Sequence, residues 1–226
     1  MNVHWLQHAD FEDLGCIAPW IVARGHTVTC TRLYAGETLP PHTSFDWLIV
    51  MGGPMNIYEY DQYPWLRAEK RLIGEAIAAN KRVLGLCLGS QLIADVLGGK
   101  VTRNAHTEIG WFPVHKTTRE HSLLDDFPET FDVFHWHGDT FAIPADARPL
   151  ASSEACANQA FAYGERVLGL QFHPEVTASN VRDWLAHERV TVARYVQDPE
   201  QMLDDVPRYA QINRLMLKLL ERLEAA

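Results

Sequence analysis

The 226-residue chain has little positive charge and no long apolar run, and each shortage excludes a class of protein. Only 20 lysine and arginine residues stand against 29 acidic ones, for a formal net charge of -9. The basic residues are scattered, whereas a nucleic-acid-binding surface usually gathers them into a patch, so we expect no nucleic-acid partner. No stretch approaches the roughly 20 apolar residues that a membrane-spanning helix needs, so we expect no membrane partner either.

Cysteine is also scarce, and its positions are typical neither of a metal site nor of a redox pair. The four cysteines are Cys16, Cys30, Cys87 and Cys156. The first residues lack the charged start and the long apolar core of a secretory signal. A reduced, cytoplasmic setting fits both features.

Nothing in the sequence marks a linker, because no Ser/Gly tract, charge block or internal repeat interrupts the chain. We therefore expect one globular domain at residues 1–190. Residues 191–226 then form a C-terminal helical extension that packs on the same domain. Apolar residues recur at helical spacing from Ile212 to Leu223, which indicates docking on the chain itself, with a homodimer contact as the alternative.

The first hundred residues alternate between strand and helix patterns. The expected strands are residues 3–6, 27–33, 46–51 and a run from residue 83, and the expected helices are residues 11–24 and 64–79. Short connections between such elements favour an α/β fold with a mixed, mostly parallel central sheet and helices on both faces.

The pattern changes after Gly99, where short strand candidates follow one another with few helices between them. They are residues 101–103, 111–115, 131–135, 157–163 and 167–172. We expect this half of the chain to add antiparallel strands to the edge of the sheet.

The strongest functional signal is a cysteine between two glycines. Gly85, Cys87 and Gly89 form a Gly-x-Cys-x-Gly core between an apolar strand and a helix-like run. A sharp strand-to-helix turn of this kind is a nucleophile elbow, in which small residues avoid collisions across the turn. The N-terminus of the helix then lies beside the sulfur, where it stabilises negative charge. The pattern predicts Cys87 as a nucleophile.

A nucleophilic cysteine needs a base, and a second segment supplies one. An apolar strand ends in His173, a proline follows, and Glu175 lies two residues beyond the histidine. Neighbouring parallel strands would bring Cys87 and His173 to the same carboxyl edge of the sheet. Glu175 would then accept the other ring N–H of His173 and fix its tautomer.

Other polar features allow more than one interpretation. Gly52-Gly53-Pro54 follows a buried strand and is either a plain turn or a loop that donates a backbone N–H to an oxyanion. His135 and His137 are spaced like metal ligands, but no cysteine or carboxylate set completes a site, so we expect no metal. The remaining N-terminal histidines have no evident partners, and we expect them to be solvated or partly buried: His4, His8, His26 and His42.

Four segments in this order resemble the class I, or triad, glutamine amidotransferase family. They are Gly52-Gly53-Pro54, residues 85–91 (GLCLGSQ), residues 136–139 (WHGD) and residues 169–175 (GLQFHPE). Together they are specific and spread over most of residues 1–180. The chain is similar above all to the glutaminase domain of GMP synthase, a subgroup that residues 108–111 (EIGW) also fit. The resemblance implies the flavodoxin-like α/β fold of that family.

The resemblance also implies a role for each matching residue. The implied catalytic triad is Cys87, His173 and Glu175. The implied oxyanion hole uses the backbone N–H groups of Leu88 and of the Gly52–Gly53 loop, which we assign to Gly53. The residues implied to contact the glutamyl part of the substrate are Gln91, Gly138 and Asp139. No cofactor and no metal are implied.

The chain departs from GMP synthase in one respect. Those synthases carry an ATP-dependent synthetase domain that receives the ammonia, whereas here a helical segment follows Glu175 and no phosphate-binding loop appears. We therefore expect a stand-alone protein that acts on a small-molecule substrate. A separate synthetase subunit is one candidate partner for accepting ammonia.

The leading hypothesis is hydrolysis of a γ-glutamyl amide through a γ-glutamyl thioester on the cysteine. Two alternatives stay open. The substrate can be a γ-glutamyl peptide or conjugate rather than glutamine, which an open cleft beyond the scissile amide would favour. The chain can also be a non-catalytic binding or regulatory protein on this fold, although a complete set of triad residues speaks against that.

Overall fold

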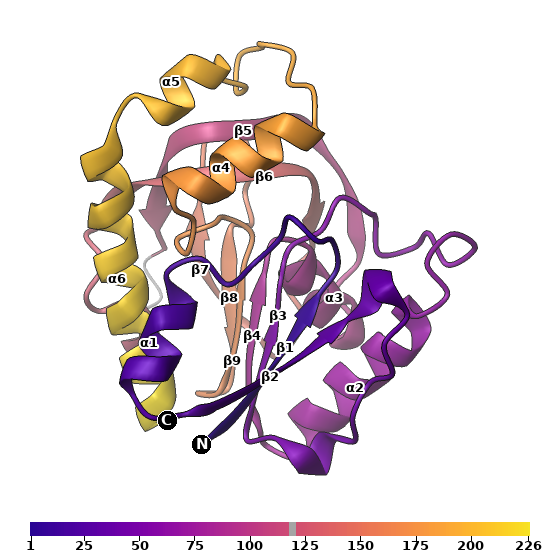
Figure 1. Cartoon of the computed structure of the whole chain (residues 1–226). Helices are drawn as coiled ribbons and strands as arrows, with labels where there is room; N and C mark the ends of the chain where they lie inside the picture. Colours follow the sequence, from indigo (N-terminus) through magenta and orange to yellow (C-terminus); the bar gives the residue numbers. More distant parts are fainter. Residues whose placement is uncertain (118–120) are drawn as a thin grey trace.

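A nine-stranded mixed sheet forms the centre of the computed structural model, which describes residues 1–117 and 121–226 (Figure 1). One half of the sheet is parallel. In spatial order its strands are β2 (Thr27–Arg32), β1 (Asn2–Gln7), β3 (Trp47–Val50), β4 (Arg82–Leu86) and β9 (Val167–Leu170). The last three are almost wholly buried apolar runs, as is usual for parallel strands that are covered on both faces.

The other half is antiparallel and continues from β9. Its strands are β8 (Ala160–Tyr163), β7 (Arg148–Ser152), β5 (Val101–Lys116) and β6 (Thr130–Phe141). The α/β fold and the antiparallel edge expected from the sequence are thereby confirmed. Where the sequence predicts two short strands, β5 is continuous, because it pairs with β6 on both sides of an irregularity between Arg103 and Glu108.

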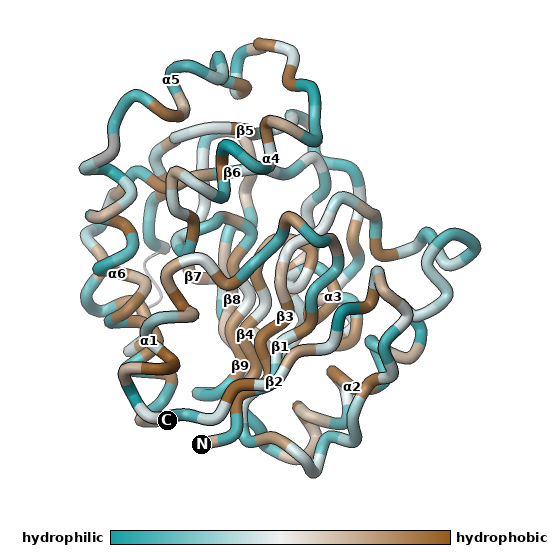
Figure 2. The backbone as a smooth tube through the Cα atoms, viewed as in Figure 1, coloured by the Kyte–Doolittle hydropathy of each residue, from teal (hydrophilic) through white to brown (hydrophobic). Residues whose placement is uncertain are grey.

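Helices cover both faces of the sheet (Figure 1). One hydrophobic cluster includes α2 (Leu66–Ala78) and α3 (Leu88–Val96), and the other includes α1 (Ile17–Ala23), α4 (Ala178–His187), α5 (Pro199–Leu203) and α6 (Val206–Ala225). Alternate residues of a strand divide between them, since Val83 joins the first cluster and Leu84 the second. Figure 2 shows the same arrangement as hydrophobic central strands beneath more polar outer segments.

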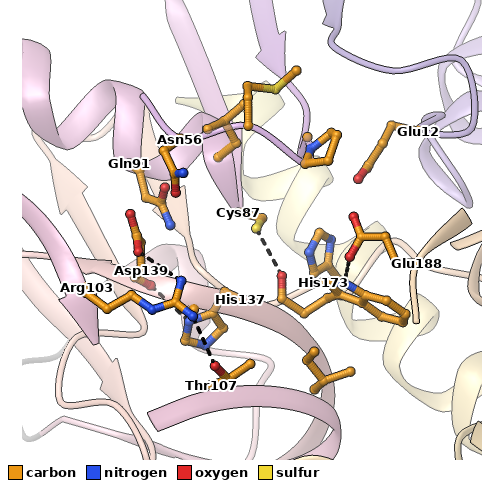
Figure 3. A pocket seen from close by; sticks show the side chains of 17 residues that line it. Glu12, Asn56, Cys87, Gln91, Arg103, Thr107, His137, Asp139, His173 and Glu188 are labelled. Carbon is orange, nitrogen blue, oxygen red and sulfur yellow. Dashed lines mark hydrogen bonds and ion pairs between the residues drawn. The ribbon is translucent and has the colours of Figure 1, made fainter. Parts of the chain in front are cut away.

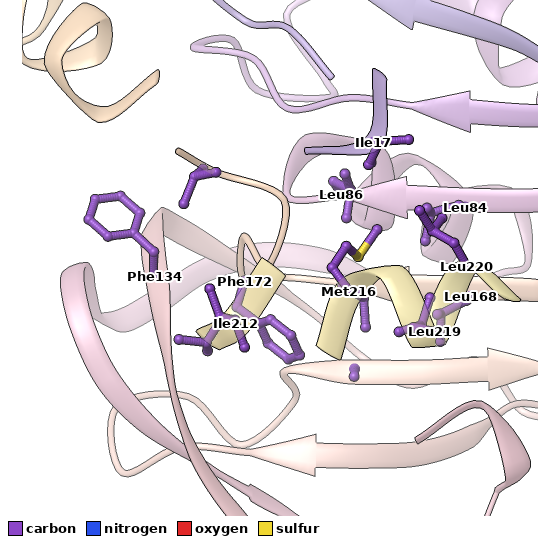
Figure 4. Close-up of a cluster of buried hydrophobic side chains, with 14 of the residues drawn as sticks. Ile17, Leu84, Leu86, Phe134, Leu168, Phe172, Ile212, Met216, Leu219 and Leu220 are labelled. Carbon is purple, nitrogen blue, oxygen red and sulfur yellow. The ribbon is translucent and has the colours of Figure 1, made fainter. Parts of the chain in front are cut away.

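The C-terminal helix α6 supplies much of the second cluster (Figure 4). The buried residues of its apolar stripe are Ile212, Met216, Leu219, Leu220 and Leu223. They belong to one cluster with Leu84 and Leu168 of the central strands. The stripe is thus covered within the chain, and the domain boundary at residue 190 stays a prediction.

The first helix begins later than the sequence indicates. It starts at Ile17, so the prediction of helix over residues 11–16 is wrong, and these residues form a loop. Gln7 Nε2 holds the loop by donating to the Glu12 carbonyl oxygen at 2.8 Å. Gly15 has a φ of +49°, and a Cβ added there would lie 2.2 Å from the Glu175 carbonyl oxygen. The loop therefore packs directly on the segment that follows β9.

Among the described helices, none combines the length and the apolar character needed to cross a bilayer.

Candidate functional site

Cys87 occupies a sharp turn between β4 and α3. The residue has a φ of 48° and a ψ of -106°, a conformation that L-residues rarely adopt. A Cβ on Gly85 would lie 2.5 Å from the backbone of Gly89, so the close approach across the turn requires glycine. The strand, turn and helix expected around Cys87 are all present, and backbone strain of this kind gathers at functional sites.

The parallel neighbour of β4 brings a histidine to this cysteine. Leu86 lies opposite Leu170 in the pairing of β4 with β9, so the residues after both strands meet at one edge of the sheet. Nδ1 of His173 lies 2.7 Å from Oε1 of Glu175, and both side chains are buried. This contact leaves the other ring nitrogen on the side of Cys87 (Figure 3).

The charges around His173 favour its protonated form. Burial lowers the pKa of His173, but the Glu175 carboxylate and the neighbouring Cys87 outweigh that effect and raise the pKa well above its usual value. The Cys87 sulfur lies 3.5 Å from the Trp136 carbonyl oxygen and 3.7 Å from the donor Nε2 of Gln171. The sulfur therefore lies beside the ring whose positive charge the site favours.

Two other parts of the chain hold the segment that carries Glu175. Nδ2 of Asn213, on α6, donates to the carbonyl oxygens of Pro174 at 2.9 Å and Val176 at 3.0 Å. The backbone N–H of Cys16 donates to the Glu175 carbonyl oxygen at 2.9 Å. The C-terminal helix and the N-terminal loop therefore fix this segment from both sides.

Cys87 and His173 line an open cavity of about 210 Å³ (Figure 3). Gly53 and Leu88 line it as well. The Leu88 N–H opens α3 and so has no acceptor within the helix, and the Gly53 N–H has no acceptor in the described part of the chain. Both donors are available to an oxygen atom of a ligand.

Three further residues indicated by the sequence, Gln91, Gly138 and Asp139, line the cavity, and Gln91 and Asp139 lie on the side away from His173 (Figure 3). Gln91 donates through Nε2 to Oε1 of Gln171 at 3.1 Å, which links it to the residue that contacts the cysteine sulfur. Asp139 is buried at the end of the WHGD segment. A Cβ on Gly138 would lie 2.5 Å from the guanidinium of Arg103, so glycine admits that side chain.

Several polar residues near Asp139 carry no sequence signal. Arg103 Nη1 lies 3.4 Å from Oδ1 of Asp139, and the Tyr58 hydroxyl donates to Oδ2 at 2.9 Å. Asn56 and Thr107 also line the cavity. They come from loops and a long strand without a short motif, so only tertiary structure brings them together.

Glu12 is a cavity-lining carboxylate that the sequence analysis missed. It lies near His173 and Glu188 (Figure 3), and its buried Oε2 accepts no hydrogen bond from the described residues. Burial raises the pKa of Glu12 to about 7, although the nearby His173 acts in the opposite direction. The sequence does not indicate Glu12 as a site residue, because the segment around it has a helical pattern.

The expectation that His8 is solvated or only partly buried, without a convincing partner, is wrong. Its side chain is fully buried, with Nε2 2.7 Å from Oε1 of Glu69 and Nδ1 2.7 Å from the Gly52 carbonyl oxygen. Glu69 lies on α2, far from His8 in the sequence, so no local pattern announces the contact. Of the other N-terminal histidines, His4 is also buried and contacts two threonine hydroxyls.

His135 and His137 do have a carboxylate neighbour, contrary to the sequence analysis. Candidate ligand atoms of Glu108, His135 and His137 lie within 4.8 Å of one another. Oε2 of Glu108 already contacts Nε2 of His137 at 3.1 Å and accepts from Ser153 at 3.1 Å and Gln159 at 2.7 Å. Glu108 and His137 therefore form a buried hydrogen-bond network with Ser153 and Gln159. Neither ring nitrogen of His135 has a hydrogen-bond partner among the described residues.

Comparison with known proteins agrees with this geometry. Residues 16–190 match the family model described as glutamine amidotransferase class-I. The glutamine amidotransferase-like protein YfeJ of Salmonella typhimurium is 36% identical over 237 aligned positions, which cover 100% of this chain and 98% of that protein.

Two further relatives differ in how much they share. The crystal structure of a glutamine amidotransferase from Thermotoga maritima has a TM-score of 0.89 and 34% identity, covering 99% of this chain and 97% of that one. The glutamine-hydrolyzing GMP synthase of Vibrio atlanticus is 37% identical over 134 residues, which cover 58% of this chain but only 24% of the synthase. The similarity to GMP synthase is thus confined to part of that longer protein.

Proposed function

Since the chain belongs to the class I glutamine amidotransferase family, we propose that it hydrolyses a γ-glutamyl amide, with glutamine as the first candidate substrate. Cys87 is the nucleophile, His173 the general acid and base, and Glu175 the residue that orients the imidazole. One observation carries this proposal: a strained cysteine lines one cavity with a histidine whose other ring nitrogen meets a buried glutamate.

The reaction follows from the positions of these groups. The Cys87 thiolate attacks the δ-carbonyl carbon, and the π electrons of the carbonyl move onto its oxygen. The intermediate collapses when Nε2 of His173 gives its proton to the leaving nitrogen, which leaves a γ-glutamyl thioester on the sulfur. His173 then removes a proton from water, and the water oxygen attacks the thioester carbonyl. The C–S bond breaks, glutamate departs, and the Cys87 thiolate and the protonated His173 are restored.

The N–H groups of Gly53 and Leu88 are the proposed donors to the oxyanion. Both line the cavity beside the sulfur, and neither is occupied by an acceptor in the described chain. Each such donor typically lowers the barrier by about 3 kcal/mol. The Leu88 N–H directly follows the strained turn at Cys87, so this donor is in place before the substrate binds.

The opposite side of the cavity suits the amino-acid end of a glutamyl group. Arg103 can bind an α-carboxylate and Asp139 an α-ammonium, since charge-assisted hydrogen bonds of this kind are strong. Gln91 and Gly138 complete the same wall. We assign the glutamyl portion to this side and the leaving group to the side of His173, because that residue must protonate it.

A panel assay tests the proposal. Purified protein is given glutamine and several γ-glutamyl amides, and the release of ammonia and of glutamate is followed separately. Cys87→Ala should abolish turnover, whereas Cys156→Ala, at a buried cysteine outside the cavity, should leave it nearly unchanged. Full activity of Cys87→Ala on any of these substrates would contradict the proposal.

A γ-glutamyl conjugate with an amine-bearing leaving group is a second candidate substrate. Two carboxylates, Glu12 and Glu188, line the cavity on the leaving-group side, and Oε2 of Glu12 has no hydrogen-bond donor in the described chain. A cationic leaving group would supply the missing donor. The γ-glutamyl amide of a diamine should then have a higher kcat/KM than that of a neutral amine, and Glu12→Gln should reduce the ratio.

The same panel separates the remaining alternatives. Ammonia release from glutamine that rises when a synthetase subunit is added would support transfer to a partner. No turnover of any substrate, together with no alkylation of Cys87 by a glutamine-analogue electrophile, would favour a binding or regulatory protein.

A further inference from the structure

A second buried histidine–carboxylate pair lies on the other side of the Gly52–Gly53 loop. His8 follows β1, Glu69 lies on α2, and both side chains are inaccessible to solvent. Nε2 of His8 meets Glu69 Oε1 and Nδ1 meets the Gly52 carbonyl oxygen, each at 2.7 Å. Trp65 stacks on the ring with a centroid separation of 5.6 Å. The imidazole thus connects a helix rigidly to the loop.

The Gly52 carbonyl decides where the ring carries its proton. A carbonyl oxygen can only accept, so Nδ1 of His8 must be the donor in this contact. Nε2 then either donates to a Glu69 carboxylate or accepts from a protonated Glu69. Burial lowers the pKa of His8, but Glu69 and the Gly52 carbonyl outweigh it and raise the pKa, which favours the charged pair. In either state the Nδ1–H points at the loop.

The peptide unit carries this contact into the cavity. The carbonyl of Gly52 and the N–H of Gly53 belong to one trans peptide and point in opposite directions. A carbonyl held toward His8 therefore directs the Gly53 N–H away from His8, and Gly53 itself lines the cavity. Glycine on both sides makes rotation of this peptide cheaper than it would be between residues with side chains.

We propose that His8 and Glu69 are positioning residues that keep the Gly53 N–H directed at the cavity above Cys87. This inference rests on the proposed function, in which that N–H binds the oxyanion. If the His8 contact is lost, the peptide can turn and present its carbonyl oxygen where negative charge develops. Glu69 acts through the ring, which it holds in the orientation that Gly52 needs.

Substitutions at His8 test the inference directly. His8→Leu removes the donor, and His8→Asn keeps an N–H close to the position of Nδ1. For the best γ-glutamyl amide we expect kcat of His8→Leu to fall about 10²–10³-fold, the usual cost of one oxyanion donor, with KM changed only a few fold. His8→Asn should recover most of the loss. His4→Leu, at a buried histidine on β1 that contacts Thr29 and Thr31, is the matched control and should stay near wild type.

Alkylation by iodoacetamide separates a positioning role from general damage. The thiolate of Cys87 displaces iodide without an oxyanion hole, so the alkylation rate should be unchanged in every variant. A His8→Leu protein that keeps its kcat would overturn the inference. A variant that loses alkylation in step with hydrolysis would also overturn it.

Failure of the proposed function would be visible separately, as absence of turnover in the wild-type protein. Crystal structures of the two variants then decide the inference. A Gly52–Gly53 peptide that is turned in His8→Leu and unturned in His8→Asn supports it. An unturned peptide in His8→Leu contradicts it.

Discussion

Two buried histidine–glutamate pairs flank the Gly52–Gly53 loop and differ in what the remaining ring nitrogen meets. His173–Glu175 and His8–Glu69 have the same 2.7 Å separation between nitrogen and oxygen, and both are withdrawn from solvent. In the first pair the remaining nitrogen faces Cys87. In the second it is engaged by the Gly52 carbonyl. The same kind of histidine–glutamate pair therefore faces the cysteine in one place and holds a backbone carbonyl in the other.

The difference shows that a histidine–carboxylate pair is not by itself a catalytic device. His173 can exchange a proton with the sulfur and the leaving group, since one of its nitrogens is open to the cavity. His8 has no nitrogen left for substrate, and its position affects the reaction only through the backbone that it holds. Substitutions in the two pairs should consequently have different signatures.

Loss of His173 should have the largest effect. His173→Ala removes the group that protonates the leaving amine and activates water, so kcat should fall about 10³–10⁴-fold. Glutamate release under saturating substrate measures this, with His8→Asn as the comparison variant. A fall in kcat smaller than tenfold would contradict a catalytic role for His173 that the His8 pair does not share.

The next largest effect should be the difference in kcat between substitutions of Glu175 and of Glu69. Glu175→Gln removes the charge that supports the imidazolium and should lower kcat about 10²–10³-fold, whereas Glu69→Gln can still hydrogen-bond the His8 ring and should cost less than about tenfold. The pH–rate profile adds a second criterion, because only the first substitution acts on a group that exchanges protons in the reaction. Equal losses would contradict the proposed roles.

Glu12 should influence stability in a pH-dependent manner. Burial raises its pKa from the ordinary 4.5 to about 7, so the folded protein binds the proton more tightly than the unfolded chain. This contribution is fully present below pH 4.5, is lost as the pH rises through about 7, and amounts to about 3 kcal/mol. Glu12→Gln should therefore gain stability relative to wild type between pH 4.5 and pH 8.

Urea denaturation at several pH values measures this difference. The wild-type protein is the reference at each pH, so contributions from other titrating groups cancel. A stability difference that does not change with pH would show that Glu12 keeps an ordinary pKa in the folded protein.

Asn213 should have the smallest effect. Asn213→Ala leaves the carbonyl oxygens of Pro174 and Val176 without this donor, which should cost about 1–2 kcal/mol of stability. The looser Glu175 segment should also lower kcat a few fold. Gln211→Ala, at an exposed position of α6, is the control. Thermal denaturation measures stability, and glutaminase assays measure kcat. Equal stability and equal kcat of the two variants would show that the Asn213 contact is unimportant.

Local sequence patterns predicted the first histidine pair and missed the second, for a physical reason. Cys87, His173 and Glu175 lie at ends of short buried strands, where glycine and proline leave a recognisable pattern, and parallel pairing of two such strands brings them to one edge. His8 and Glu69 meet because a loop and a helix pack together. Neither residue has a local pattern that points to the other.

The same distinction applies to the fold. The α/β class follows from periodicity in the strands and helices, but the loop at residues 11–16 resembles a helix in its spacing of apolar residues. Tertiary contacts override that pattern, because Gln7 bonds the loop backbone and Gly15 packs against Glu175. Glu12 lines the cavity because this segment is a loop. The apolar periodicity alone would have placed Glu12 on a helix.

The most direct test of the central claim is mass spectrometry of the protein quenched during turnover of its best γ-glutamyl substrate. The account predicts a covalent adduct with the mass of one γ-glutamyl group on the peptide that contains Cys87. The adduct should be absent in Cys87→Ala. Steady hydrolysis by the Cys87→Ala protein, or an adduct on another residue of the wild-type protein, would contradict it.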